Sequence, residues 1–530
     1  MRVYEWMMRN KTNRNTVFLI FILFAFLFSF IRINSAFGVD SGAFISNAYE
    51  LSKGSVMYRD IVDHKPPGIE WYILSVFKIF GYNLFAVRFI SIVVFVIAAI
   101  AIYMIGKELF NQQVGLLSLF FFCIEPLIFV IKPYGLCQTL WVVYLWLPSF
   151  YLFIKGVKEN KGIFILISGF LAGLSVIMKQ VGIFLLLVFI VYLLMELNMK
   201  NIFSKAKLLF LTFFGFSIPI VLMIYYFWIN NALNDFWMYV IEVNQLHLFM
   251  EFPKKIIYVF NFYLGRVILF VASGVLLSWF LNFNINKPRS TDKDNILKIN
   301  IKSVLYNKSI IVLFVWFGIN ILFVFLLKPL YAHYLIPTIP SLCLLSGLVV
   351  SKISNGVVFG YDGCYLNNAA PPYQKENNKK VDKFVLSVML ILLILTVPFF
   401  SSEAYTFISG YPNVSITEEK EIGQYIKSIT NQSDKIMVFT NPIFYFRSER
   451  DPATKYLYYT WVWEESAKKE EFNNAILNGL RAEDTKVVLL SNVYEKEIPK
   501  EFIDVIKEGY NPIKSFEYRY HDGITIYVKR

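Results

Sequence analysis

Acidic and basic side chains that could carry out acid–base chemistry gather in a short polar stretch after the first long apolar run. Asp40 comes first, and Asp60, His64 and Lys65 follow before a pair of prolines. Irregular polar backbone beside a membrane is a place where functional residues concentrate. A carboxylate there could accept a proton at the boundary between water and lipid. We therefore predict that residues 34–83 form an outer loop that carries the active site.

The pattern around Asp40 predicts how these groups are placed. Residues 41–52 put apolar side chains at helical spacing, so we expect an amphipathic helix on the membrane surface with Asp40 at its N-terminal end. A helix N-terminus favours an ionised carboxylate, so helix capping is the alternative role of Asp40. The two prolines that follow Lys65 fix an extended turn, which we expect to aim Lys65 and His64 back toward Asp40.

Composition identifies the class of protein. The 530 residues are 57% hydrophobic and 18% aromatic but only 17% charged, which is far more apolar than a soluble protein of this size. The formal net charge of +13 is typical of Lys and Arg in cytoplasmic loops and does not require a nucleic-acid partner. The four cysteines are scattered and predict neither a disulfide framework nor a zinc cluster. We expect a polytopic α-helical protein of the plasma membrane.

Apolar runs of about 17 to 25 residues, which is enough to cross the hydrocarbon of a bilayer, occur about eleven times. The runs are 17–33, 84–105, 114–131, 139–154, 163–178, 181–197, 208–228, 256–280, 310–327, 335–351 and 384–400. Basic residues before the first run predict a retained signal anchor with a cytoplasmic N-terminus. An odd number of spans then puts the C-terminus outside, and Lys and Arg are enriched in the loops expected inside.

Four basic side chains fall on the outer side in this topology, each beside the end of a span. They are Lys132, Lys179, Lys328 and His333. Snorkelling to the membrane interface would explain each of them separately. Anion binding would explain why they share one side of the membrane.

Soluble patterning begins beyond residue 400. Residues 1–400 predict a transmembrane domain, and 401–530 predict an extracytoplasmic α/β domain of about 120 residues. The elements expected in the second domain, in chain order, are a helix at 415–430 that opens on a capping box, a strand at 435–440, a helix around 464–480, a strand at 486–490, a helix at 499–508 and strands near 516–520 and 525–529.

Several motifs together resemble the polyprenyl-phosphate-sugar-dependent glycosyltransferases of the GT-C superfamily. These motifs are, in chain order, Asp40 after the first span, Gly54 to Tyr58-Arg59-Asp60, Lys65-Pro66-Pro67, Arg88 in the second span, Gly173-Leu174 to Lys179, His333-Tyr334 to Pro337 and Pro340, and Arg450 to Tyr456 in the outer domain. The resemblance is greatest to the group that contains protein O-mannosyltransferases, lipid A aminoarabinose transferase and rhizobial galacturonosyltransferases. It covers nearly the whole chain.

The resemblance implies that a sugar passes from a polyprenyl phosphate to a hydroxyl of a lipid, glycan or protein on the outer face. By the same resemblance Asp40 is the general base. Many relatives have a second acid before the fourth span, where this chain has Cys137-Gln138-Thr139. Either Asp60 or Asp63 fills that role, or no second acid is needed. Basic and polar side chains would hold the lipid phosphate, namely Lys65, His64, Arg88, Lys179, Lys328, His333 and Tyr334. The resemblance calls for no cofactor, and no metal-ligand cluster of the usual spacing is visible, although a divalent metal stays open.

Two other functions are kept as alternatives. A transporter or flippase for lipid-linked sugars would also be apolar and basic inside, but repeated halves and charges at the bilayer midplane are not evident. An oligosaccharyltransferase-like member of the same superfamily is nearer, although the outer domain has no Trp-Trp-Asp signature. Enzymatic transfer without a gradient would separate transfer from transport.

Overall fold

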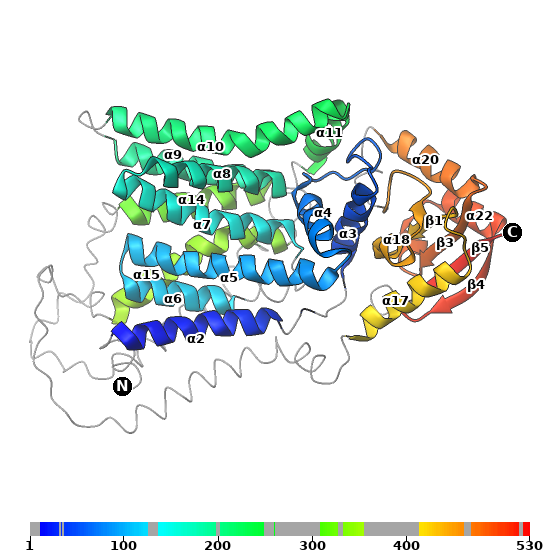
Figure 1. The fold of residues 1–530 in the computed structure, drawn as a ribbon, viewed down its shortest axis with the longest axis horizontal. Coiled ribbons are helices and arrows are strands. Elements are labelled where there is room, and N and C mark those ends of the chain that lie inside the picture. The colour runs from blue at the N-terminus through cyan, green and yellow to red at the C-terminus, as the bar shows by residue number, and fades with distance from the viewer. Residues whose placement is uncertain are drawn as a thin grey trace, which may run out of the picture.

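The structure is a computed structural model that describes residues 11–30, 33, 37–125, 136–197, 202–247, 259, 308–326, 332–354, 413–459, 468–518 and 523–530. Long helices lie side by side in a bundle, two shorter helices sit at one end of it, and a small mixed α/β domain lies beyond them (Figure 1). The predicted fold class is confirmed.

The bundle consists of apolar helices, some of which are long enough to span a membrane. They are α2 (Lys11–Phe30), α5 (Leu84–Leu109), α6 (Gln112–Ile124), α7 (Gln138–Glu159), α8 (Gly162–Met178), α9 (Phe184–Met195), α10 (Ile202–Ile229), α14 (Lys308–Leu326) and α15 (Ile339–Ser354). Short connecting helices are η2 (Gln180–Ile183), α11 (Leu233–Trp237), η3 (Met238–Glu242), η4 (Val243–His247) and η6 (Ala332–Thr338).

Five helices in the described part of the chain are long and apolar enough to span a membrane. They are α5, α7, α10, α14 and the continuous pair η6 and α15. Shorter apolar helices occupy the expected runs 17–33, 114–131, 163–178 and 181–197. The expected spans 256–280 and 384–400 lie outside the described residues, so the predicted number of eleven stays a prediction.

Small residues bring two of these helices into close contact. A Cβ atom on Gly169 would lie 2.3 Å from the carbonyl oxygen of Thr212, and one on Gly173 would lie 2.2 Å from that of Phe216. Glycine at these positions of α8 therefore lets the backbone of α10 approach, as is common between helices in lipid. The opposite face of α10 exposes Phe210, which suits contact with lipid chains.

The outer loop folds into helices α3 (Val39–Ser52) and α4 (Gly68–Phe80). The helix expected at 41–52 is present, but its expected position on the membrane surface was wrong. Residues 41–51 of α3 are all buried. The helix packs against α4 and against α18 (Ile443–Ser448) of the C-terminal domain, so protein covers it on its faces. The N-cap is Gly38, and Asp40 lies in the first turn, so the capping role considered for Asp40 was wrong.

The C-terminal domain is built on a five-stranded sheet in the order β2-β1-β3-β5-β4. The strands are β1 (Lys435–Phe439), β2 (Asp451–Pro452), β3 (Thr485–Ser491), β4 (Tyr510–Phe516) and β5 (Ile524–Lys529), and the helices are α17 (Asn413–Ser428), α18, α20 (Lys469–Arg481), α21 (Tyr494–Glu497) and α22 (Lys500–Gly509). β1 pairs in parallel with β2 and β3, whereas β5 is antiparallel to β3 and β4. Apolar residues of β1 and β3 form its core.

Most elements predicted for this domain are confirmed, with one strand misplaced. The strand expected near 516–520 instead runs from Tyr510 to Phe516, before the predicted segment, although its sequence contains Pro512. This strand lies at the edge of the sheet, where a proline is tolerated because one side of the strand needs no partner. The pattern also gave no sign of the two-residue β2 or of α18.

The C-terminal domain is joined to the outer loop by hydrogen bonds and by close packing. The Ser46 hydroxyl of α3 donates to the carbonyl of Pro442 at 2.6 Å, and the backbone N–H of Val62 donates to the carbonyl of Lys455 at 2.9 Å. A Cβ atom on Gly42 would lie 1.9 Å from Oδ1 of Asn441, so only glycine fits at this position of α3. The helix that carries Asp40 is therefore held by the C-terminal domain.

Candidate active site

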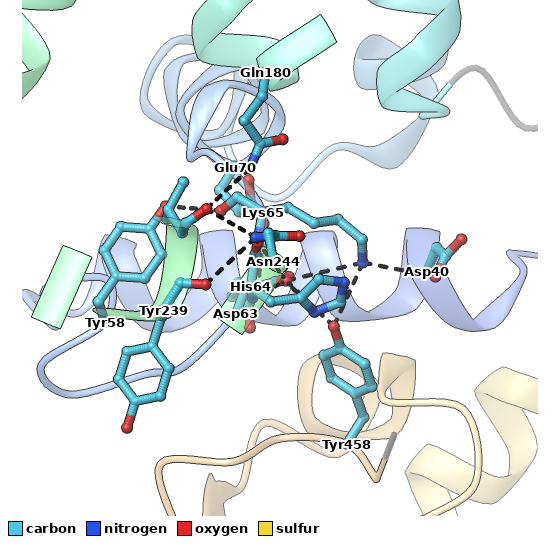
Figure 2. A network of polar contacts seen from close by, with 12 residues as sticks. Asp40, Tyr58, Asp63, His64, Lys65, Glu70, Gln180, Tyr239, Asn244 and Tyr458 are labelled. Carbon is cyan, nitrogen blue, oxygen red and sulfur yellow. Dashed lines mark hydrogen bonds and ion pairs between the residues drawn. The ribbon is translucent and has the colours of Figure 1, made fainter. Parts of the chain in front are cut away.

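Lys65 is the centre of the polar cluster at this junction. Its ammonium lies 3.9 Å from Oδ1 of Asp40 and 3.8 Å from Oδ1 of Asp63. Its side chain extends toward Asp40 and ends above the ring of Tyr458, as Figure 2 shows, and the ammonium donates to the Tyr458 hydroxyl at 3.5 Å. The predicted return of the Lys65 side chain toward Asp40 is confirmed.

Asp40 and Asp63 contact the same ammonium from very different surroundings. The side chain of Asp40 is 45% exposed, whereas that of Asp63 is completely buried. Oδ1 of Asp63 accepts the backbone N–H groups of His64 at 2.6 Å and Lys65 at 3.2 Å, and the Tyr458 hydroxyl at 3.3 Å. Asp63 is thus a fixed counter-charge, while Asp40 is open to an incoming molecule.

A second buried acid lies behind Asp63. The amide nitrogen of Asn47 donates to Oδ2 of Asp63 and to Oε1 of Glu70, both at 3.4 Å. Glu70 is completely buried, and its Oε2 atom has no hydrogen-bond partner among the residues that the structure describes. Burial, together with the charge of Asp63, raises the pKa of Glu70 to about 8. Glu70 therefore carries its proton at neutral pH.

The negative charge of Asp63 and the positive charge of Lys65 each favour the ionised form of the other side chain. Burial raises the pKa of the Asp63 carboxyl, and the Lys65 ammonium and the His64 N–H work against that rise. Burial also acts against the charged form of Lys65, but Asp63, Asp40 and Glu70 outweigh it and raise the pKa of Lys65. With Asp63 held by several donors, we assign the negative charge to Asp63 and the proton to Glu70.

The loop around Lys65 is fixed by its own backbone contacts. The Tyr58 hydroxyl donates to the carbonyl of Lys65 at 2.8 Å, and Tyr58 itself has a left-handed backbone with φ of 70°. The Asn244 amide donates to the carbonyl of His64, which ties the loop to η4. The imidazole of His64 lies against Asp63, with Nδ1 at 3.5 Å from Oδ1. His64 thus belongs to the cluster.

A second basic side chain reaches the cluster from the bundle. Gly68, just after the prolines, packs against the end of α8, where its Cβ would lie 2.7 Å from the carbonyl oxygen of Ile177. Lys179 comes directly after α8. Its ammonium donates to the Thr139 hydroxyl at 2.9 Å and lies 4.5 Å from the centre of the Tyr334 ring. Loop and bundle therefore place two lysines in one region.

Tyr334 interacts with both of these lysines. Its ring lies under the ammonium of Lys179 and in edge contact with the ring of His333, and its hydroxyl is among the groups that raise the pKa of Lys65. The structure thus brings together Asp40, His64, Lys65, Lys179, His333 and Tyr334. In this arrangement an exposed carboxylate lies beside the Lys65 ammonium, and Tyr334 lies next to a second ammonium, that of Lys179. Such groups can bind a phosphate and accept a proton.

Known proteins resemble this chain in sequence over part of its length and in fold over nearly all of it. Residues 64–227 match the sequence family described as dolichyl-phosphate-mannose-protein mannosyltransferase. The structure matches ArnT from Cupriavidus metallidurans bound to undecaprenyl phosphate with a TM-score of 0.59 at 14% identity, over 98% of each chain. The chain has the fold of ArnT. The resemblance inferred from its motifs is confirmed.

Two further solved structures share the GT-C fold. ArnT from Cupriavidus metallidurans in the apo state matches with a TM-score of 0.59 at 11% identity, over 96% of this chain and 97% of that one. The apo oligosaccharyltransferase of Archaeoglobus fulgidus matches with a TM-score of 0.51 at 10% identity, over 92% of this chain and 70% of that one. A search of curated proteins gave no match.

Within this GT-C frame, two predicted site residues lie in other surroundings. Arg59 binds Asp60 through two nitrogens at 2.9 and 2.8 Å and the carbonyl of Asn230 at 2.9 Å, so Asp60 belongs to a turn beside the end of α10. The ion pair lowers the pKa of Asp60. The buried Arg88 donates to the carbonyl of Ile33 at 2.7 Å and faces the C-terminal domain.

Lys328 lies outside the described residues, so its predicted role stays a prediction. Among the residues that are described, no three His, Cys, Asp or Glu side chains are grouped so that they could hold a metal ion. The buried cysteines Cys123, Cys137 and Cys343 are free thiols.

Three residues of the cluster were missed in the sequence. Glu70 is the one acid of the apolar helix α4, Asn47 lies among other polar side chains on α3, and Tyr458 lies in a different domain from Lys65. The acid in α4 is a usable signal, because burying a carboxyl group is unfavourable without a role for it. The contribution of Tyr458 had no signal in the sequence, since it depends on how the domains dock.

Proposed function

We propose that this protein is a membrane glycosyltransferase that passes a sugar from a polyprenyl phosphate to a hydroxyl group on the outer face of the membrane. The observation that carries the proposal is the pairing of the exposed Asp40 carboxylate with the fixed Lys65 ammonium, 3.9 Å apart. The fold and the family match of residues 64–227 support the same reaction class. The sugar and the acceptor are not specified by these residues.

In the proposed reaction Asp40 acts as the general base. It takes the proton of the acceptor hydroxyl while the acceptor oxygen attacks the anomeric carbon. The bond between that carbon and the phosphate oxygen breaks at the same time, and its electron pair leaves with the polyprenyl phosphate. The acceptor gains the sugar, usually with inversion in enzymes of this type, and the proton stays on Asp40.

Lys65 and Lys179 stabilise the leaving phosphate in this proposal. The phosphate gains negative charge as the glycosidic bond breaks, and two ammonium groups facing it lower the energy of that state. Asp63 keeps Lys65 charged and in place, and the Tyr334 ring supports Lys179 from 4.5 Å. The structure of ArnT bound to undecaprenyl phosphate shows that a protein of this fold binds such a lipid, which supports a polyprenyl phosphate donor here.

Binding of the donor would also activate the base. Before the phosphate arrives, the Lys65 ammonium is paired with Asp40 at 3.9 Å. A phosphate that draws the Lys65 ammonium toward itself would break this pair and put a negative charge near Asp40. Since a carboxylate accepts a proton more readily when a cation leaves and an anion arrives, acceptor deprotonation would be coupled to donor binding.

We further propose that the protein is a multi-pass protein of the plasma membrane with a cytoplasmic N-terminus. Residues 1–400 would form the transmembrane domain and residues 401–530 the extracytoplasmic domain. The enrichment of Lys and Arg in the loops expected inside supports this orientation. The outer-loop helices and the C-terminal domain lie at one end of the bundle, so they share one side of the membrane (Figure 1).

A transfer assay without a membrane gradient tests the proposed reaction. Purified full-length protein in nanodiscs is given a radiolabelled sugar on a polyprenyl phosphate together with a lipid, glycan and protein extract. We expect label to become covalently bound to a component of the extract, and Asp40→Asn protein to give none. Movement of the lipid-linked sugar across vesicles without any covalent product would instead establish a flippase.

A further inference from the structure

A second group of basic side chains lines a cavity between the bundle and the C-terminal domain. The cavity has a volume of about 500 Å³, and Arg88, Lys420 and Arg447 contribute its positive charge. A smaller cavity of about 240 Å³ adjoins it and shares the side chains of Lys420 and Arg447. Arg88 comes from the start of α5, whereas the other two residues come from α17 and α18. The cavity therefore exists only in the assembled protein.

Positive charge dominates the larger cavity. The buried Glu419 is paired with Arg447 at 3.1 Å and lies behind the wall, and the cavity lining itself includes no acid. Lys420 is exposed, and no acid in the part of the chain that the structure describes forms an ion pair with it. Nε of Arg447 is also without a hydrogen-bond partner among the described residues. These donors suit an anionic group.

Aromatic side chains form the other wall of the cavity. Phe80 and Tyr82 are each 54% exposed and Phe85 is 49% exposed, and they surround the turn from α4 into α5. α5 is one of the helices long and apolar enough to span a membrane, so we expect this turn to lie where the helix leaves the bilayer. Exposed aromatic residues are typical of the membrane–water interface. The cavity thus opens at the depth of lipid headgroups.

We propose that this cavity binds the phosphate-bearing headgroup of an anionic lipid from the outer leaflet and presents that lipid as the acceptor. Three basic side chains match the headgroup, and the aromatic wall matches the glycerol and upper acyl region. Lys65 and Lys179 serve the donor phosphate, so this cavity provides for a second anion. The role as acceptor site rests on the proposed function, whereas the lipid site does not.

The cavity is close enough to the proposed base for this role. Phe37 lies in the cavity wall beneath the Arg88 guanidinium, which is 3.7 Å from the centre of its ring. Asp40 follows Phe37 by three residues, and three Cα steps span at most about 11 Å. The Cα atoms of Phe37 and Asp40 are thus at most about 11 Å apart, and the proposed role requires a sugar or glycerol hydroxyl on a headgroup held beside Phe37 to span that distance.

Calorimetric titration of the full-length protein in detergent tests the lipid site. The probes are dihexanoyl phosphatidylglycerol, dihexanoyl phosphatidylcholine and inorganic phosphate. We expect the anionic lipid to bind more tightly than the other two, and Lys420→Gln to weaken its binding about fivefold, as expected for one basic side chain near a headgroup. Lys420→Arg should restore the affinity because it retains the charge, and Lys500→Gln on α22 is the matched control, expected to bind like wild type.

Each other outcome has a definite meaning. Equal binding of both lipids, or an unchanged affinity in Lys420→Gln, overturns the headgroup site. If inorganic phosphate binds as tightly as the anionic lipid, the ligand of the cavity is a soluble anion and the lipid proposal is overturned. Asp40→Asn protein should bind the anionic lipid normally although it transfers no sugar. If no transfer is found in wild type but the lipid still depends on Lys420, the proposed function fails and the lipid site stands.

Discussion

The hydroxyl of Tyr458, in the C-terminal domain, donates a hydrogen bond of 3.3 Å to the buried carboxylate of Asp63 in the first outer loop. The same hydroxyl lies 3.5 Å from the ammonium of Lys65. The domain beyond the bundle is therefore part of the polar cluster, because it supplies a donor to the counter-charge that holds Lys65. This contact gives the C-terminal domain a role in the proposed reaction besides covering the cavity.

Replacing Tyr458 with Phe removes this donor and leaves the ring in place. Loss of a hydrogen bond to a buried charged group costs about 1 to 3 kcal/mol, so we expect transfer activity to fall about tenfold or more. Steady-state kinetics of the purified variant check this, with the effect on kcat/KM. Tyr459→Phe, on the neighbouring residue, is the control and should retain activity, and equal loss in both variants would contradict a specific role of Tyr458.

Replacing Asp40 with Asn removes the proposed base without changing the size of the side chain. We expect transfer to fall by a factor of about 100 or more, while expression and thermal stability stay near wild type, because the side chain is half exposed. Asp60→Asn should have a milder effect, since Asp60 is paired with Arg59 in its own turn. Activity of Asp40→Asn equal to wild type would remove Asp40 from the mechanism.

Replacing Glu70 with Gln tests its protonation through the pH dependence of stability. The folded protein keeps the Glu70 proton up to pH about 8, whereas an exposed glutamate in the unfolded chain releases it near 4.5. The folded state binds more protons in that window, so its stability is greatest below 4.5 and falls as the pH rises through 8. The apparent Tm should therefore fall less with rising pH in Glu70→Gln.

A second acid with the opposite shift provides the control for that measurement. Burial opposes the charge of Glu471, but ion pairs with Lys455 and Lys468 lower its pKa to about 2. Its stabilising effect is present above pH 4.5 and is lost as the pH falls toward 2. Glu471→Gln should thus lower the apparent Tm at neutral pH.

A Glu70→Gln protein with the pH profile of wild type would show that Glu70 is ionised.

Replacing Gly42 with Ala tests the docking of the C-terminal domain on α3. The added methyl group would overlap Oδ1 of Asn441, which already accepts the N–H of Ile443 at 3.1 Å. We expect a loss of about 1 to 3 kcal/mol in stability and a parallel loss of activity. Gly318→Ala in α14 is the control, because no described atom beyond the neighbouring backbone of its own helix lies within 4 Å of the added Cβ, and the change should be neutral or stabilising. Limited proteolysis and Tm measurements distinguish the two.

Much of the architecture could be predicted because hydrophobic length carries that information directly. Helices α5, α7 and α10 coincide with apolar runs, and strands β1 and β3 coincide with short apolar segments. The meeting of Lys65 with Asp40 was also predictable, because the prolines after Lys65 constrain a short loop. Local sequence determines both kinds of feature.

The remainder depends on contacts between distant segments. The burial of α3 could not be predicted from the spacing of its apolar residues. The helix packs between the bundle and the C-terminal domain, so it has no face exposed to solvent that a polar pattern would indicate. Arg88 was grouped with the phosphate-binding lysines because it is a cation near the outer side. The structure instead turns it toward Lys420 and Arg447, over three hundred residues away in the chain.

The burial of α3 has a consequence for how the protein meets different membranes. A surface helix would rise and sink with the lipid, and its carboxylate would move with it. Here Gly42, Ser46 and Asn47 attach the helix to protein on several faces, so the height of Asp40 is set by the bundle and the C-terminal domain. Changes in bilayer thickness or lipid packing therefore leave the distance between the base and Lys65 unchanged.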